Sequence, residues 1–342
     1  MKAIDLFCGA GGLTLGLRRA GWHVLAGIDV DAAVGETYGR NNPNARFLAS
    51  DLRSVTGEDV LVLAGNTPRR ELLLAGCAPC QPFSKQRRRR GLDRRSDGTL
   101  LGHFSRLVAA LRPGTVLMEN VPGITTVPGF SSFRRFLKLL RDCGYGYEHR
   151  VLNARDFGVP QHRRRCVLLA VHGSEAKLPT PLIREPDQGG ATVRASIGRF
   201  PAIAAGEAHR CIPNHVAAGL SPLNLERIRA TPADGGSRRD WPERLTLDCH
   251  RRTSGFSDVY GRMWWDRVAP TLTSRCNSLS NGRFGHPEQD RAMSLREAAA
   301  LQTFPDDYEF FGTRNRIAGW IGNAVPVSFA EALGAAAIRA AA

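Results

Sequence analysis

Residues 76–84, a segment with two cysteines, are the part of this sequence best suited to covalent chemistry. They read Gly-Cys-Ala-Pro-Cys-Gln-Pro-Phe-Ser and directly follow an apolar run, where a buried strand should end. Parallel α/β folds bind their ligands at this carboxyl edge of the sheet. Cys80 would attack a substrate as a thiolate, and seven basic residues between Lys85 and Arg95 would lower its pKa. The segment therefore predicts a nucleophilic cysteine at a ligand-binding edge.

The same cysteines allow two other interpretations. Cys77 and Cys80 form a Cys-x-x-Cys tetrad, which could be a redox dithiol or half of a zinc site. No second Cys or His pair with metal-ligand spacing follows in the sequence, and Gln-Pro-Phe-Ser is not a helix start of the thioredoxin kind. A single nucleophile fits better, and we predict no metal site. A dithiol enzyme would need Cys77 as much as Cys80.

A glycine-rich turn near the N-terminus is typical of a nucleotide-type cofactor site. Residues 5–12 run from a strand-like segment into a helical one, and glycine lets a ligand approach backbone amides closely. Thr14 replaces the last glycine of Gly-x-Gly-x-x-Gly, which weighs against a dinucleotide. Asp29 and Asp51 end the next two strand-like runs and could accept hydrogen bonds from ribose hydroxyls. Ordinary turn carboxylates are the alternative explanation.

Two further clusters accompany later strands. Glu119 ends a strand on the same edge as Cys80, where a buried carboxyl could stay protonated and act as a general acid. Arg163 and Arg165 alternate just before another strand, which would set both on one face, suited to clamping a base oxygen and phosphates. Taken singly, a structural glutamate and a solvated basic edge strand remain alternatives.

Alternating short apolar runs and helical patterns over the first 170 residues predict a doubly wound α/β sheet. Strands are expected over 3–7, 23–28, 46–48, 72–75, 115–119, 147–152 and 166–171, and helices near 12–20, 32–40, 99–111 and 131–142. From about residue 173, prolines and glycines break every long period, which predicts a separate loop-rich module. A capping box at Ser294 and an Ala-rich run from about 327 predict two helices near the C-terminus.

The composition favours a nucleic-acid partner inside the cell. The 342 residues carry a formal net charge of +15, and only four of the 47 basic residues are lysine. Arginine suits bidentate contacts with phosphates and guanine edges, although the codon usage of a GC-rich genome would also explain the ratio. No apolar run approaches the ~18 residues of a membrane span, and no signal-peptide pattern is present. We therefore expect a cytoplasmic protein without a membrane partner.

In chain order, these segments resemble the cytosine carbon-5 DNA methyltransferase family of bacterial restriction-modification systems. The signature pieces are Asp5-Leu-Phe-Cys-Gly-Ala-Gly-Gly, Asp29 to Tyr38, Asp51, Pro79-Cys80-Gln81-Pro-Phe-Ser, Glu119-Asn-Val, Gln161-x-Arg-x-Arg, Arg296-Glu-Ala-Ala-Ala-Leu-Gln-Thr-Phe-Pro and Gly322-Asn323-Ala-Val-Pro-Val. They cover about 1–171 and 285–342, whereas 173–283 matches only in position and texture. The resemblance implies a Rossmann-like, doubly wound mixed sheet that binds S-adenosylmethionine, with a smaller loop-rich DNA-recognition domain.

The resemblance also implies domains and a role for each site residue. A catalytic domain would span 1–172, a target recognition domain 173–284, and a segment 285–342 would return to the first. Cys80 would add to cytosine carbon 6, and the adjacent Gln81 is implied as a further catalytic residue. Glu119 would hold ring nitrogen 3 and the exocyclic amine. Arg165, aided by Arg163, would hold the base oxygen. The residues implied around S-adenosylmethionine are Phe7, Gly9, Gly11, Asp29, Val30, Asp51, Leu52, Pro79 and Asn323.

The partner implied is double-stranded DNA with the target cytosine flipped out of the stack. The expected contacts are Ser84, Lys85, Arg87, Arg88, Arg89 and Arg90 in a lid, and Arg238, Arg239, Arg251 and Arg252 in the recognition region, where Trp241, Trp264 and Trp265 are further candidates. We expect a monomer that is associated with the nucleoid through DNA, with a cognate restriction endonuclease acting separately.

Two departures from the family pattern and two alternatives remain. Gly76-Cys77-Ala78 stands where the family often has an acidic residue or proline, so the pocket behind Cys80 would differ in shape. Val30 stands where a larger side chain often packs on adenine, so stacking there should be weaker. The alternatives are an RNA (tRNA) cytosine methyltransferase on the same scaffold and a catalytically dead nucleic-acid-binding relative.

Overall fold

Seven strands pair into one mixed sheet with the order β3-β2-β1-β4-β5-β7-β6. The strands are β1 (Lys2–Leu6), β2 (His23–Asp29), β3 (Arg46–Ala49), β4 (Leu72–Gly76), β5 (Thr115–Asn120), β6 (Tyr145–Asn153) and β7 (Arg164–His172). β1 to β5 are parallel to one another, whereas β7 is antiparallel to both of its neighbours, β5 and β6. The predicted doubly wound mixed sheet is confirmed, with each predicted strand end within two residues of the observed one.

This computed structural model describes residues 1–78, 100–126, 131–182, 191–251 and 258–342. The chain divides into two units: unit 1 comprises 1–157, 164–182 and 325–342, and unit 2 comprises 158–163 and 183–324. The predicted boundaries differ from this division, because 285–324 groups with the recognition region and only the residues from 325 onward group with the sheet.

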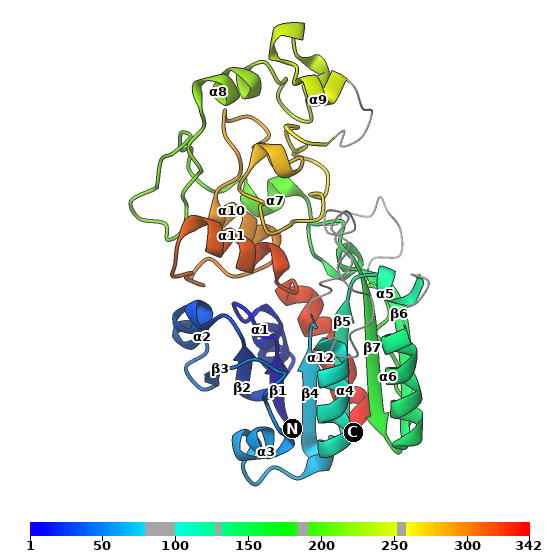
Figure 1. Cartoon of the computed structure of the whole chain (residues 1–342). Coiled ribbons are helices and arrows are strands. Elements are labelled where there is room, and N and C mark those ends of the chain that lie inside the picture. The colour runs from blue at the N-terminus through cyan, green and yellow to red at the C-terminus, as the bar shows by residue number, and fades with distance from the viewer. Residues whose placement is uncertain (79–99, 127–130, 183–190, 252–257) are drawn as a thin grey trace. The chain divides into compact units, whose positions relative to one another are not determined.

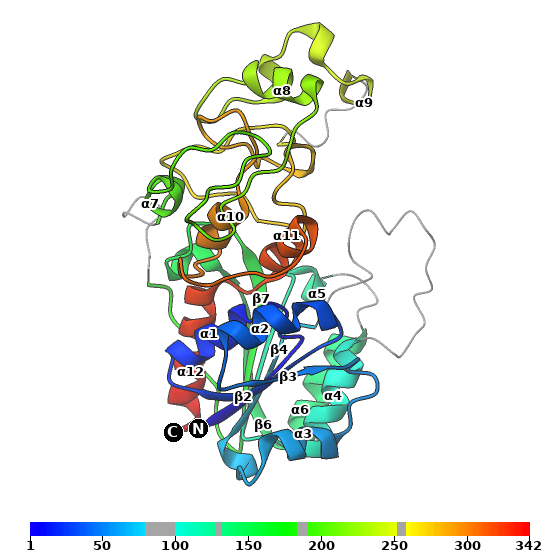
Figure 2. The same ribbon diagram turned by 90° about the vertical axis from the view of Figure 1, so that its left-hand side faces the viewer.

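Helices cover both faces of the sheet in unit 1 (Figures 1 and 2). The helices of this unit are α1 (Gly12–Arg19), α2 (Gly35–Asn41), α3 (Gly57–Ala64), α4 (Leu100–Leu111), α5 (Gly123–Thr126), α6 (Ser131–Asp142) and α12 (Val327–Ala341). α3, α4 and α6 bury apolar side chains such as Phe104 and Phe136 in the main core. α1 packs closely on α12, because Gly16 has no side chain: a Cβ there would lie 2.3 Å from the Cβ of Ala330.

α3 was not among the predicted helices. Thr56 accepts a hydrogen bond from the Asp59 amide, and the Asp59 carboxylate accepts one from the Thr56 amide, which makes a capping box. Thr-x-x-Asp before an apolar run is the sequence signal of such a start. The helix could therefore have been predicted from that signal.

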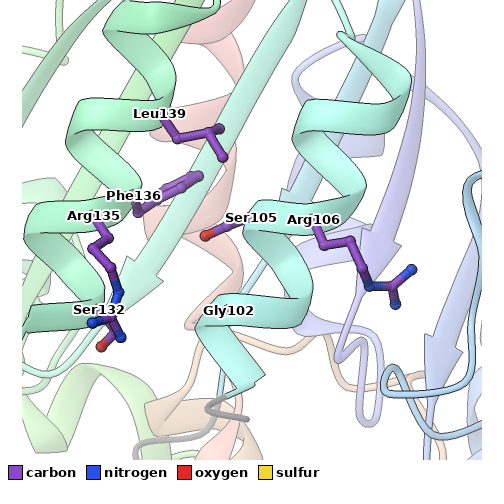
Figure 3. A pocket seen from close by; sticks show the side chains of 7 residues that line it. All are labelled: Gly102, Ser105, Arg106, Ser132, Arg135, Phe136 and Leu139. Carbon is purple, nitrogen blue, oxygen red and sulfur yellow. The ribbon is translucent and has the colours of Figure 1, made fainter. Parts of the chain in front are cut away.

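A hollow of about 450 Å³ lies between α4 and α6 (Figure 3). Ser105 from α4 and Phe136 and Leu139 from α6 point into the space between the two helices, whereas Arg106 points to the other side of α4. Arg106 Nη2 donates to the carbonyls of Leu52 and Val55 at 3.2 and 2.7 Å. None of the residues predicted to bind a ligand lines this hollow.

Unit 2 has short helices joined by long loops, as predicted for a loop-rich module. The helices are α7 (Val193–Ile197), α8 (Pro222–Arg229), α9 (Asp248–Arg251), α10 (Leu295–Leu301) and α11 (Arg314–Asn323). The predicted capping box is confirmed at Ser294, at the start of α10. The fully buried Arg291 pairs with Glu297 at 2.6 Å and donates to the Ile203 carbonyl at 3.1 Å. The bond to Ile203 ties 285–301 to an earlier loop of unit 2, the unit to which this segment belongs.

A single described stretch, Arg314–Ala341, is long and apolar enough to cross a membrane by length and composition. It consists of α11 and α12, with Pro326 between them. Of its most apolar window, 61% is buried within the protein, as in the core helices of globular proteins.

A carboxyl group is buried between β1 and α1. Asp5 is 0% exposed, and its Oδ2 accepts a hydrogen bond from Thr14 Oγ1 at 2.7 Å. Thr14 Oγ1 also lies 3.0 Å from the Tyr38 hydroxyl. Asp5 Oδ1 has no hydrogen-bond partner among the described residues. Burial, opposed in part by the Thr14 bond, raises the pKa of Asp5 to about 7.

We expect this carboxyl to make stability fall as the pH rises. The unfolded chain loses the Asp5 proton near pH 3.8, whereas the folded chain keeps it to about pH 7. Between these values the unfolded state binds fewer protons, so the stability contribution of Asp5 declines by at most ~1.4 kcal/mol per pH unit. Asp5→Asn should therefore gain stability relative to the wild type across this window. Denaturant unfolding from pH 5 to 8 measures this gain, and a difference that does not change with pH would contradict it.

Candidate active site

The carboxyl ends of four strands meet at one edge of the sheet. Leu6 of β1 pairs with Ile28 of β2 and Gly76 of β4, and Gly76 pairs with Met118 of β5. Parallel strands in this register end at the same level, so the residues after these pairs are neighbours. They include the turn 7–11, Asp29 and Glu119, which were predicted to act in the site, together with Cys77.

The turn after β1 has the backbone of a close-approach ligand loop. Phe7, Gly9 and Gly11 adopt positive φ angles of 63°, 49° and 87°. Such a conformation is strained for Phe7, and strain of this kind concentrates at functional sites. A Cβ on Gly9 would meet nothing within 4 Å, so open space lies beside the turn.

Asp29, at the end of β2, fixes the shape of this turn. Its Oδ2 accepts from the Gly9 amide and its Oδ1 from the Asp31 amide, both at 2.9 Å. Burial raises the pKa of Asp29 above its usual value. The neighbouring Val30 is 69% exposed, which leaves an apolar side chain uncovered beside the open space predicted for a cofactor.

Asp51 and Leu52 lie after β3 and are less open than predicted. The Asp51 carboxylate pairs with the Arg53 guanidinium, with Nε 3.0 and 2.9 Å from its two oxygens, and these bonds lower the Asp51 pKa. The side chain of Leu52 is 4% exposed and belongs to the main core. A ligand at this position would therefore contact the backbone of Leu52. It would bind Asp51 either by displacing the Arg53 side chain or beside it.

Glu119 and Arg165 form an ion pair at the end of β5. Glu119 pairs in register with Val167, and Arg165 lies two residues earlier on the same face of β7, a diagonal neighbour. Arg165 Nε is 3.0 Å from Glu119 Oε1, and the side chains are 14% and 9% exposed. The Arg165 N–H is not aligned with Oε1 for a hydrogen bond, and Oε1 accepts no hydrogen bond from the described residues. The carboxyl therefore keeps acceptor capacity for a ligand.

Asn120 is a functional residue that the sequence analysis did not single out. Its Nδ2 donates to the Ala78 carbonyl at 3.0 Å, and its Oδ1 accepts from the Val121 amide at 2.9 Å. Asn120 thereby fixes the backbone two residues before Cys80. Its place between Glu119 and Val121 in the Glu-Asn-Val signature was the available signal.

Arg163 does not accompany Arg165 on a strand face, contrary to the prediction. β7 begins at Arg164, and the buried Arg163 donates to the carbonyls of Leu272 and Gly322 at 3.2 and 3.1 Å. Gln161 and Gln302 complete this buried network: Gln161 Nε2 donates to Gln302 Oε1 at 2.9 Å. The alternation of arginines was therefore a misleading signal, because the strand starts one residue later than the pattern requires.

Asn323 is the last residue of α11 in unit 2 and is exposed. The carbonyls around it are held by the same network: Gly322 by Arg163, and Ile321 and Ala324 by Gln302 Nε2 at 2.6 and 3.2 Å. The network fixes the backbone at Asn323 and leaves its side chain exposed.

Several predicted residues lie outside the described residues: Pro79, Cys80, Gln81, Ser84, Lys85, Arg87, Arg88, Arg89, Arg90 and Arg252. Of the remaining predicted DNA contacts, Arg239 is exposed, Arg238 is half-buried, and the exposed Arg251 lies 3.6 Å from Glu243. Trp241 and Trp265, suggested as further contacts, are each 7% exposed. These two aromatics therefore belong to the core.

No group of three or more His, Cys, Asp or Glu side chains that could hold a metal ion occurs among the described residues. Cys77 is half-buried and directly follows β4.

Comparison with known proteins identifies the family. The family model for C-5 cytosine-specific DNA methylases matches residues 1–339. The type II methylase M.HgiDII of Herpetosiphon aurantiacus is 42% identical over 96% of this chain and 93% of its own. The type II methyltransferase M1.HphI of Haemophilus parahaemolyticus is 35% identical over 98% of this chain and 86% of its own.

Solved structures share the fold. A protein described as a DNA modification methyltransferase encoded within an E. coli prophage superposes with a TM-score of 0.77, covering 99% of both chains at 23% identity. The Dnmt2 methyltransferase of S. pombe gives 0.65 at 17% identity, covering 99% of this chain and 98% of its own. The chain therefore belongs to the C-5 cytosine-specific DNA methylase family, and its function is methylation of carbon 5 of cytosine in DNA.

Proposed function

We propose that this enzyme transfers a methyl group from S-adenosylmethionine to a flipped-out cytosine within a specific duplex DNA sequence, through a covalent bond to Cys80. The observation that carries the proposal is the hydrogen bond from Asn120 to the Ala78 carbonyl beside the Glu119–Arg165 pair. It fastens the backbone that leads to Cys80 next to two side chains that can hold a cytosine.

Carbon 5 of cytosine is a poor nucleophile, so the ring must first be activated. The Cys80 thiolate forms a bond to carbon 6, which breaks the aromaticity and places electron density on carbon 5. Glu119 holds ring nitrogen 3 and the exocyclic amine as this charge builds, and Arg165 binds the base oxygen. After methylation, a base such as water takes the proton from carbon 5, and the electron pair of that C–H bond restores the double bond between carbons 5 and 6 and expels the Cys80 thiolate.

S-Adenosylmethionine supplies an electrophilic methyl group on a sulfonium. The turn after β1 fits this donor, because Gly9 leaves open space and the exposed Val30 offers an apolar surface for the adenine. Asp29 is placed to accept the ribose hydroxyls, and Phe7, Gly11, Asp51, the Leu52 backbone, Pro79 and Asn323 complete the site. Arg163 holds the backbone at Asn323 instead of the base oxygen.

The basic residues serve the DNA partner. Ser84, Lys85 and Arg87 to Arg90 contact the phosphates around the flipped base, and the loop-rich unit 2 recognises the sequence. The enzyme acts as a monomer in the cytoplasm, at the nucleoid, and a cognate endonuclease acts separately. The net charge of +15 supports a polyanionic partner.

Transfer of labelled methyl to mixed-sequence duplex DNA tests the function. We expect methylcytosine at one recurrent sequence in bisulfite sequencing, and none with Cys80→Ala, because the attack on carbon 6 is lost. Cys77→Ala is the matched control and should keep most of the activity. Equal loss in both variants would favour the dithiol interpretation, and label transferred only to tRNA would overturn the DNA substrate.

We expect the loss of Arg165 to reduce catalysis and the loss of Arg163 to reduce stability. Arg165→Ala should lower kcat ~10²-fold, because a donor to the charged base disappears, with the fold retained. Arg163→Met should mainly lower stability, by ~1–3 kcal/mol, because two buried carbonyls lose their donor. Steady-state kinetics with urea unfolding separates the two effects. A stable Arg163→Met with the kinetic defect of Arg165→Ala would restore the paired-clamp prediction.

We expect Asp29→Ala to weaken S-adenosylmethionine binding ~10-fold or more, because both the ribose contact and the Gly9 bond are lost. Asp31→Ala is the control, since the Asp31 side chain caps the short helix after β2 and the substitution keeps the amide that donates to Asp29. Calorimetric titration measures both affinities. Equal affinities for Asp29→Ala and the wild type would remove Asp29 from the site.

A further inference from the structure

Trp264 in unit 2 lies beneath two arginines. The guanidinium carbons of Arg283 and Arg267 are 4.2 and 4.7 Å from the centre of its ring. Gly235 approaches the ring so closely that a Cβ would lie 1.8 Å from Nε1, and its φ of +104° also requires glycine. We refer to Arg267, Trp264 and Arg283 as the Trp264 stack.

The inner arginine of this stack is fixed by the backbone. Arg283 is 9% exposed, and its Nη1 donates to the carbonyls of Gly235, Gly236 and Arg262 at 2.8, 3.1 and 2.9 Å. Its Nε lies 3.4 Å from Asp258. A guanidinium with these partners has little rotational freedom, so it holds the Trp264 ring in one orientation.

The backbone that carries the stack is also fixed. The Met263 amide donates to the Gly285 carbonyl at 2.9 Å, and the Trp265 amide donates to Asp234 at 2.7 Å. The Arg267 carbonyl accepts from the Val193 amide at 2.9 Å. The outer side chain, Arg267, therefore projects from a rigid segment.

The side chain of Arg267 is exposed and has no hydrogen bond or ion pair with the residues that the structure describes. The adjacent Asp266 pairs with Arg194 at 2.8 and 3.0 Å instead of with Arg267. Five of the other exposed arginines of unit 2 pair with acids, namely Arg194, Arg199, Arg229, Arg244 and Arg251, and are therefore less available to a ligand. Arg267 thus keeps its charge and its paired donors for a ligand.

We propose that Arg267, held on Trp264, is a DNA-contact residue that binds paired acceptor atoms, either the O6 and N7 of a guanine or the oxygens of a phosphate. The planar guanidinium matches both acceptor pairs, and stacking on a fixed ring lowers the entropy lost on binding. This inference rests on the proposed function and adds a residue to the predicted contacts.

Duplex binding by the full-length enzyme tests the contact with three variants. Arg267→Ala should weaken binding to duplex DNA that contains the enzyme's target sequence by about ten-fold. Arg199→Ala is the matched control, because Arg199 is also exposed and stacked, on Phe200, but pairs with Asp306. It should bind within about two-fold of the wild type. Arg267→Lys keeps the charge and loses the planar fork.

A contact to a phosphate and a contact to a guanine predict different binding and specificity results. A phosphate contact predicts that Arg267→Ala weakens binding to all sequences with a smaller salt dependence, and that lysine largely restores it. A guanine contact predicts relaxed methylation specificity at one position that lysine does not restore. Thermal unfolding and cofactor affinity should not change in either case.

Two results overturn the inference. One is wild-type affinity and specificity in Arg267→Ala, and the other is an equal loss in Arg199→Ala, which would reflect net charge alone. If the wild type methylates DNA, either result removes only this contact. A wild type that neither binds nor methylates DNA would overturn the proposed function together with it.

Discussion

The parallel register of β1, β2, β4 and β5 is the constraint on which the site depends. It brings the ends of four strands to one level, although the paired residues run from Leu6 to Met118, 112 positions apart. The antiparallel β7 then enters from the same edge, and the diagonal pairing places Arg165 at 3.0 Å from Glu119. A slip of one residue in β5 would turn Glu119 to the opposite face and separate the pair. The pairing of Glu119 with Arg165 thus depends on strand register.

Buried arginines hold unit 2 together in place of a sheet. Arg262 is 3% exposed and donates to the carbonyls of Thr231, His286, Gln289 and Ile228, while Arg291 and Arg296 bind other loops in the same way. Lysine has no planar fork and could not join so many backbone segments. The low lysine content therefore reflects the architecture as well as DNA binding or codon usage. Removal of one such side chain would leave several buried carbonyls without a donor, a costly change.

Much of the sheet and the edge site could be predicted, because apolar alternation and strand-end residues are local signals. The alternation of arginines placed Arg163 on the same face as Arg165, whereas its partners are the carbonyls of Leu272 and Gly322, which are distant in the sequence and give no local signal. Trp241 and Trp265 could be either DNA contacts or core residues on sequence grounds, because burial depends on tertiary packing, and the structure buries both. The exposed Arg267 was not distinguished from other arginines, since only the structure reveals that the adjacent Asp266 pairs with Arg194.

The most direct test of the central claim is to trap the covalent bond to Cys80. Duplex DNA with 5-fluorocytosine at the methylated position blocks the last step, because fluorine cannot leave carbon 5 as a proton does. With S-adenosylmethionine, the account predicts a denaturation-stable protein–DNA adduct that peptide mass spectrometry maps to Cys80. An enzyme that methylates ordinary cytosine in the same sequence, yet forms no adduct or forms it on another residue, would contradict the account.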